Sequence, residues 1–147
     1  MIIQFVPDEF DVPLELRTDH FRLEPLGPQH NERDHQAWMS SIEHIRNTQG
    51  YLGGRWPSPM SLAKNLADIE RHAEDFAFRR GFTYSVLDDD EIIGAVYLYP
   101  TKKDDYDVQV KSWVVSSRAE LDVILWETVT RWLVEAWPFE AIHYEPR

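Results

Sequence analysis

Residues 91–139 constrain the fold of this chain more than any other stretch. They read as two strands joined by a polar turn, then a strand-to-helix corner at Ser116 and Ser117, then a long amphipathic helix. Along that helix, apolar residues recur three and four positions apart and predict one buried face: Leu121, Ile124, Leu125, Val129, Trp132, Leu133 and Ala136. The segment therefore predicts strands that lead directly into a helix packed on a sheet.

The rest of the chain extends this pattern. Alternation and the Gly and Pro positions predict strands at residues 21–26, 82–87, 92–99, 106–115 and 141–144, and helices at residues 29–49, 61–80 and 118–136. The last strand follows a helix, so we expect it to lie parallel to the strand before it, by a right-handed crossover. Residues 1–20 read as an irregular arm with a short edge strand. Residues 21–147 read as one α/β domain with a mixed, mainly antiparallel sheet flanked by helices.

Composition limits the class of protein. A chain of 147 residues with 43% hydrophobic residues is large enough to bury a core as one domain. It contains no cysteine, so thiolate chemistry and disulfides are excluded. The first residues lack the pattern of a signal peptide, and no stretch is apolar enough to span a bilayer. We therefore expect a cytoplasmic protein.

The net charge of −11 limits the partners. Phosphate affinity depends on clustered Lys and Arg, so we expect no nucleic-acid or anionic-membrane binding. A cationic partner, such as a small-molecule amine or a basic peptide, is compatible with this charge. The alternative is that the acidic residues only keep the protein in solution.

Three phrases carry a resemblance to a known family: IIGAVYLYP at residues 92–100, SWVV at 112–115 before a helix, and WPFEAIHY at 137–144 after it. In this order they resemble the core of the GNAT acyltransferase superfamily. AWMSSIEHIRNTQG, NLADIERH and FTYSVLDDD also resemble a poorly characterised bacterial GNAT-like group. The resemblance implies an N-acyltransferase that moves an acetyl group from acetyl-CoA to an amine of a small molecule or peptide by direct attack.

The resemblance also implies an acyl-CoA site. Backbone of residues 111–115 would meet the pantetheine arm, and residues 116–119 the phosphates, giving the candidate cofactor-binding residues Trp113, Val114, Val115, Ser116, Ser117, Arg118 and Ala119. The family motif at this corner is R/Q-x-x-G-x-G/A. Aligned on Arg118, this chain has Leu121 and Val123 in place of the small residues, and Ser117 with Glu120 fits a capping box. An alternative is therefore a catalytically silent GNAT-like module that has lost the pyrophosphate site and binds a ligand, a partner protein or a second copy of itself.

Catalytic candidates follow from the same comparison. Many members of the superfamily use a tyrosine near the last strand as general acid, and Tyr144 is the nearest counterpart. Asp107 could act as base through a water molecule, or be a solvated charge. Trp56, Tyr97 and Tyr99 could line an acceptor pocket, or pack within the core. The histidines are scattered without a ligand pattern, so we expect no metal site.

Overall fold

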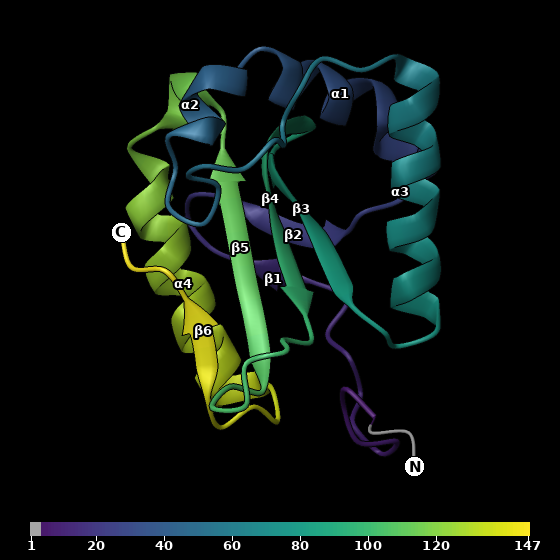
Figure 1. Ribbon diagram of the computed structural model, residues 1–147, viewed down its shortest axis with the longest axis vertical. Helices are drawn as coiled ribbons and strands as arrows, with labels where there is room; N and C mark the ends of the chain where they lie inside the picture. Colours follow the sequence, from purple (N-terminus) through teal and green to yellow (C-terminus); the bar gives the residue numbers. More distant parts are fainter. Residues whose placement is uncertain (1–3) are drawn as a thin grey trace.

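The computed structural model describes residues 4–147, and its strands form one sheet in the order β1-β2-β3-β4-β5-β6 (Figure 1). The strands are β1 (Leu16–Arg17), β2 (Arg22–Pro25), β3 (Phe82–Asp88), β4 (Glu91–Tyr99), β5 (Val108–Val114) and β6 (Ile142–Tyr144). The helices are α1 (Asn31–Met39), α2 (Ile42–Arg46), α3 (Leu62–Ala77) and α4 (Leu121–Ala136), with short 3-10 turns at Pro28–His30 and Ser116–Arg118. The predicted class and order of elements are confirmed.

The sheet is mixed because only its last pair of strands is parallel. Strands β1 to β5 pair antiparallel in sequence order, and β6 pairs parallel with β5. Val110 lies beside Tyr144 at the last paired position, whereas β5 continues to Val114. The two strands therefore part at their carboxyl ends, where α/β sheets commonly place a ligand crevice.

Strand alternation divides the core into two layers. On one face, the Trp113 indole Nε1 donates to the Tyr97 hydroxyl (3.0 Å), beneath α1 and α3. On the other face, the Tyr84 ring packs edge-on against Trp132 of α4, with centroids 5.3 Å apart. Figure 1 shows α4 beside β5 and β6, and α1 and α3 toward the other edge of the sheet.

The helix predicted for residues 29–49 is interrupted after α1. The Ser40 hydroxyl donates to the Ala37 carbonyl (2.7 Å), a local bond that competes with helix propagation. The chain turns at Ser40 and Ser41 and then forms the single turn of α2. This break matters because it directs Ser41 toward the β5–α4 corner.

The predicted capping box is wrong. Ser117 lies in the 3-10 turn and α4 begins at Leu121, with Glu120 at the N-cap and no side-chain cap bond. The physical reason is that the corner is closed by backbone bonds, in which the Arg118 amide donates to the Val115 carbonyl (3.0 Å). Ser117 is consequently exposed to solvent.

The N-terminal arm is attached to the α4 side of the sheet. The Tyr84 hydroxyl donates to the Pro13 carbonyl (2.7 Å), and Arg79 donates to the carbonyls of Pro7 and Phe10. β1 extends the sheet by pairing with β2, as the predicted edge strand requires. The arm leaves the opposite face of β4 and β5 open to the helices.

Candidate functional site

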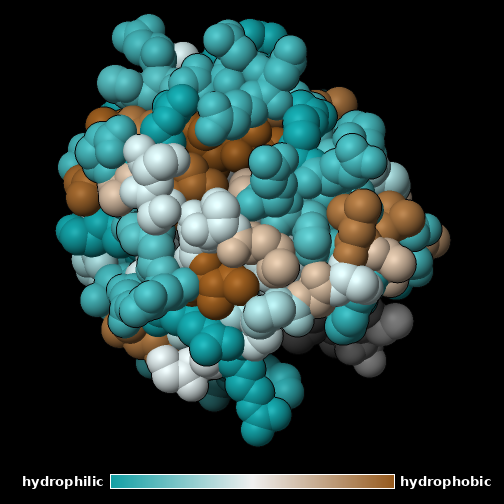
Figure 2. Space-filling view, turned by 90° about the horizontal axis from the view of Figure 1, so that it is seen from above, coloured by the Kyte–Doolittle hydropathy of each residue, from teal (hydrophilic) through white to brown (hydrophobic). Residues whose placement is uncertain are grey.

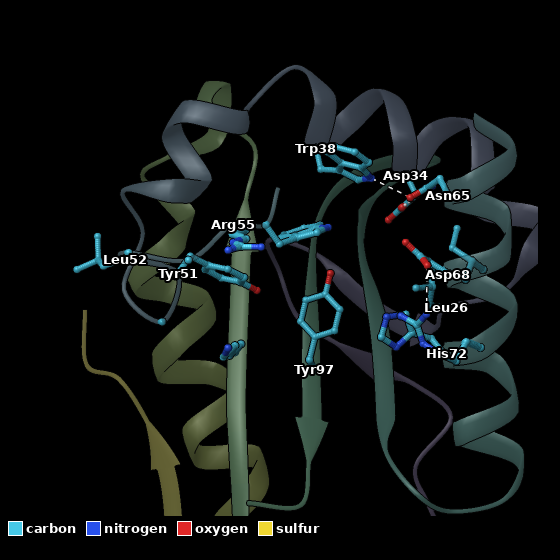
Figure 3. Close-up of a pocket in the computed structure, with 17 residues that line it drawn as sticks. Leu26, Asp34, Trp38, Tyr51, Leu52, Arg55, Asn65, Asp68, His72 and Tyr97 are labelled. Carbon is cyan, nitrogen blue, oxygen red and sulfur yellow. Dashed lines mark hydrogen bonds and ion pairs between the residues drawn. The ribbon is translucent and has the colours of Figure 1, made fainter. Parts of the chain in front are cut away.

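A pocket of about 530 Å³ lies on the α1–α3 side of the sheet, against β4 and β5. Figure 3 shows Asp34, Asn65, Asp68 and His72 on one side, loop residues Tyr51, Leu52 and Arg55 on the other, and Tyr97 between them. Helices α1 and α3, strand β4 and the loop after α2 therefore build one site. The predicted acceptor residues Trp56 and Tyr97 both line it.

Asp34 is the buried acid of this pocket. Its side chain is 5% exposed, and its Oδ2 accepts a hydrogen bond from Asn65 Nδ2 (3.1 Å). Burial raises the pKa of Asp34 to about 6, while Asn65 and His35 oppose the rise. Trp38 fixes the same asparagine by donating from Nε1 to its Oδ1 (3.1 Å). The carboxylate is mostly ionised at neutral pH although it is buried, which favours a cationic ligand.

Aromatic rings form the wall beside this carboxylate. Trp56 lies 5.7 Å from Trp38 and 6.4 Å from Tyr97 between ring centroids, and 6.3 Å from Trp113 behind them. Electron-rich ring faces attract ammonium groups, most strongly where water is excluded. Tyr99, the third predicted acceptor residue, does not line the pocket and instead contacts His72 from behind.

His72, like Asp34, is a pocket residue that sequence reasoning missed. It projects from α3 beside Tyr97, with ring centroids 5.6 Å apart, and its Nδ1 lies 2.8 Å from the Tyr99 hydroxyl. It lies on the apolar stripe of the helix predicted for residues 61–80, three residues after Ile69 and four before Phe76, and this position was the available signal. A single histidine on such a stripe has no fixed meaning until its neighbours across the sheet are known.

The pocket mouth carries basic side chains. Arg55 and Arg71 are exposed, and Lys111 extends from β5 with its Nζ 5.8 Å from the centroid of the Tyr51 ring. Tyr51 is 8% exposed, and its hydroxyl has no hydrogen-bond partner in the part of the chain described. Burial raises the pKa of Tyr51, and nearby Tyr97 and Tyr144 add to the effect. Tyr51 therefore borders the pocket beside β5, whose carboxyl end parts from β6 to leave a crevice.

That crevice is where β5 and β6 part, and Arg147 fills it. Its side chain is 4% exposed, and its guanidinium donates to the Ser112 carbonyl (2.9 Å) and pairs with Asp122 Oδ2 of α4 (2.7 Å). The Tyr144 hydroxyl lies 2.5 Å from Ser112 Oγ in the same crevice. The strand carbonyl at this position is therefore already hydrogen-bonded within the chain.

Tyr144, the predicted general acid, lies across β5 from the pocket. Its side chain shares the face of Val110 and Ser112, whereas Lys111 borders the pocket from the other face. Burial raises the pKa of Tyr144, although Ser112 and Arg147 oppose the rise. A tyrosine this firmly held fits a structural role better than proton donation into the pocket.

Asp107, the predicted base, stabilises a turn through its side chain. Its Oδ2 accepts the backbone N–H groups of Glu140 and Ala141 (both 2.9 Å), which holds the turn that enters β6. These bonds lower the pKa of Asp107. The side chain does not line the pocket, and its two backbone bonds fit a turn acceptor; its role as a base stays a prediction.

The corner predicted to bind phosphates is already occupied by bonds within the chain. The Val115 amide donates to the Ile93 carbonyl and the Ser116 amide to Ser41 Oγ, each at 2.9 Å. Arg118 is turned toward the β3–β4 turn, where it pairs with Asp88 (2.9 Å) and Glu91 (3.7 Å). These contacts leave few donors for a pyrophosphate.

The other predicted residues of this corner divide between core and surface. Trp113 and Val114 are buried in the sheet, whereas Ser117 and Ala119 are exposed. Figure 2 looks onto the end of the molecule that carries this corner, and the surface there is mostly hydrophilic. The residues present thus fit the acyl-CoA site of the fold only in part: the parted strands are there, but the phosphate end is hydrogen-bonded internally.

Solved structures with this architecture are acetyltransferases. A probable acetyltransferase aligns with a TM-score of 0.70 at 13% identity, covering 88% of this chain and 72% of that one. The acetyltransferase MccE of microcin C7 self-immunity, solved with acetyl-CoA and AMP, aligns at 0.65 with 13% identity over 84% and 67%. The ribosomal-protein-S5-alanine acetyltransferase of Vibrio fischeri aligns at 0.60 with 13% identity over 84% and 69%.

These similarities define the fold as that of the GNAT acetyltransferases, which confirms the fold that the sequence phrases implied. No family model and no curated protein matches the sequence. Within residues 4–147, no helix is long and apolar enough to cross a membrane.

Proposed function

We propose that this chain is an N-acyltransferase that binds the amine of a small molecule or peptide in the pocket described above. The observation that carries the proposal is the buried Asp34 carboxylate among aromatic rings, on a pocket that borders β5. In the fold shared with the acetyltransferases, β5 is the strand expected to bind the acyl donor. An amine placed there would lie next to the strand that positions the thioester.

The pocket chemistry selects for a protonated amine. Asp34 attracts the positive charge, and its cost of burial is offset when a cation neutralises it. Trp56 and Tyr97 provide ring faces for the ammonium or for the carbon chain next to it. The volume of about 530 Å³ suits a small molecule or one side chain of a peptide.

Acyl-CoA is the donor that the fold suggests, since MccE was solved with acetyl-CoA, and it would supply the activated thioester. In this chain, the Ser112 carbonyl becomes available to a ligand only when Arg147 releases it. An acyl-CoA donor would place the reaction in the cytoplasm.

A second candidate function is favoured by the contacts of Arg147 and Ser41. Arg147 donates to the Ser112 carbonyl and Ser41 accepts from the Ser116 amide, and an acyl-CoA would need both of these backbone groups. The protein could therefore bind the amine without transferring an acyl group. Such a binding module could act through a partner protein or as a homodimer, which sedimentation velocity would detect.

Acetylation of a probe amine separates the two functions. The protein is incubated with acetyl-CoA and tyramine, and the product is measured by mass spectrometry, while calorimetry follows the binding of each compound alone. Acetyltyramine formed by the wild type, and lost in Asp34→Asn, would support the acyltransferase. Tyramine binding with no heat from acetyl-CoA or CoA at millimolar concentration would support the binding module instead.

A further inference from the structure

A chain of hydrogen bonds runs behind the pocket and ends at His72. The Tyr99 hydroxyl donates to Asp75 Oδ2 (2.9 Å) and lies 2.8 Å from His72 Nδ1. The other carboxylate oxygen, Asp75 Oδ1, accepts from Arg80 Nε (3.1 Å). The three side chains come from two elements, α3 and β4, and meet only in the folded protein.

This chain determines which ring nitrogen carries the proton. A carboxylate can only accept, so the single Tyr99 proton is used on Asp75. The Tyr99 oxygen must then accept from His72, which requires a proton on Nδ1. The Thr83 hydroxyl, 3.2 Å from the same nitrogen, can accept from it as well. The neutral ring therefore has its lone pair on Nε2.

Nε2 is also the ring nitrogen that remains available to a ligand in the pocket. Every hydrogen bond that His72 makes within residues 4–147 uses Nδ1. The ring borders the pocket beside Tyr97, as Figure 3 shows. A lone pair on the pocket side can accept a proton or a hydrogen bond from a ligand.

The surroundings keep this imidazole neutral near pH 7. Burial lowers the pKa of His72, and the neighbouring Arg71 adds to the effect, whereas Asp75 and Asp68 oppose it. The other charged or titratable groups that face it or line the same pocket are Tyr97 and Tyr99 of β4, Asp34 of α1, Lys111 of β5, and Tyr51 and Arg55 of the loop. A neutral base with a pKa below its ordinary value is present in its active form at physiological pH.

We propose that His72 Nε2 is the proton acceptor for the amine bound in the pocket, with Tyr99 and Asp75 positioning its ring; the inference rests on the proposed function. The N–H bond of the ammonium breaks, an Nε2–H bond forms, and the nitrogen keeps the electron pair with which it would attack the thioester carbon of the acyl donor. The C–S bond breaks as the amide C–N bond forms, and the departing thiolate takes the second amine proton. The imidazolium then returns the proton to water. Asp34 holds the charged amine and His72 removes its proton.

The tautomer of His72 tests the inference without any turnover. Two-dimensional ¹⁵N NMR of the labelled protein at neutral pH should show His72 protonated at Nδ1, with the Nε2 resonance moving when tyramine is added. Tyr99→Phe removes the acceptor and should shift the proton toward Nε2. A His72 protonated at Nε2, or at both nitrogens, in the wild-type protein would overturn the proposal.

Kinetics test the role in transfer. If the wild type acetylates tyramine, His72→Gln should lower kcat by about 100-fold or more with little change in KM, and should abolish the acidic limb of the pH–rate profile. His20→Gln, at an exposed histidine outside the pocket, is the matched control and should behave as the wild type. Unchanged kcat in His72→Gln would overturn the inference and leave the acyltransferase standing. Absence of acetylation by the wild type would refute the acyltransferase. The ¹⁵N NMR measurement would still show which ring nitrogen of His72 carries the proton.

Discussion

Replacing Asp34 with Asn should stabilise the protein while abolishing its amine binding. Burial raises the pKa of this carboxyl from its ordinary 3.8 to about 6. Since a tenfold change in proton affinity is worth about 1.4 kcal/mol, keeping Asp34 ionised costs the folded state about 3 kcal/mol. Asn removes that cost, and its carbonyl can still accept the bond from Asn65. The variant should therefore be up to about 3 kcal/mol more stable than the wild type at about pH 8.

The stability difference between the wild type and the Asn variant should depend on pH in a defined direction. Between about pH 4 and pH 6 the folded wild type still holds a proton that the unfolded chain has lost, so its stability falls as pH rises through that interval. The Asn variant has no such proton. Urea unfolding of both proteins from about pH 4 to pH 8 should show a stability difference that grows with pH and levels off above about pH 7.

A stability difference that stays flat across this range would refute the reasoning, because Asp34 would then titrate alike in the folded and unfolded chains. The same variant should lose tyramine binding in calorimetry. If the variant is more stable but no longer binds tyramine, Asp34 serves ligand binding at a cost to the stability of the fold. A variant that is more stable and still binds tyramine would place the amine elsewhere.

Three further substitutions test the surrounding structure. Arg147→Ala removes a buried guanidinium from its carboxylate partner and should lower the free energy of unfolding by about 3 kcal/mol in urea titration. On the acyltransferase proposal, this substitution should also increase the affinity for acetyl-CoA. An unchanged affinity would argue against binding of acetyl-CoA in the crevice between β5 and β6. Gly94→Ala would place a methyl group against a backbone carbonyl of β5, so we expect a loss of about 3 kcal/mol or no folded protein. Tyr84→Phe removes the bond to the Pro13 carbonyl and should cost about 1 kcal/mol, with faster proteolysis of the arm; equal proteolysis rates would show that other contacts hold it.

The residues of the pocket proposed to bind the amine were only partly predictable. Trp56 and Tyr97 could be proposed because large aromatic residues in a glycine-rich loop and on one strand face often border a ligand. Asp34 and His72 could not, since an acid in one helix and a histidine in another acquire their properties from burial and from partners elsewhere in the chain. Tyr99 was predicted to line the pocket but lies behind His72. Alternation gives the face of the strand on which a side chain lies, but not whether that side chain reaches the cavity.

At the predicted acyl-CoA site, the motif comparison predicts a weakened phosphate end from local sequence alone. The sequence showed bulky residues where glycine was expected. Folding adds that Ser41, from 75 positions earlier in the chain, accepts the amide of Ser116, and that Arg118 turns to Asp88. Neither contact has a local signature.

The sequence alone determined the type and order of the main elements, because periodicity, turn residues and helix stops are local properties of the chain. It also determined the parallel last strand, because a helical crossover leaves few other arrangements. Only the tertiary structure decided where α1 ends and α4 begins, which donors the corner retains and that Arg147 fills the crevice. The physical reason is that burial and hydrogen bonding between distant segments set these features. The same long-range contacts bring Asp34, Trp56, His72 and Tyr97 to one pocket.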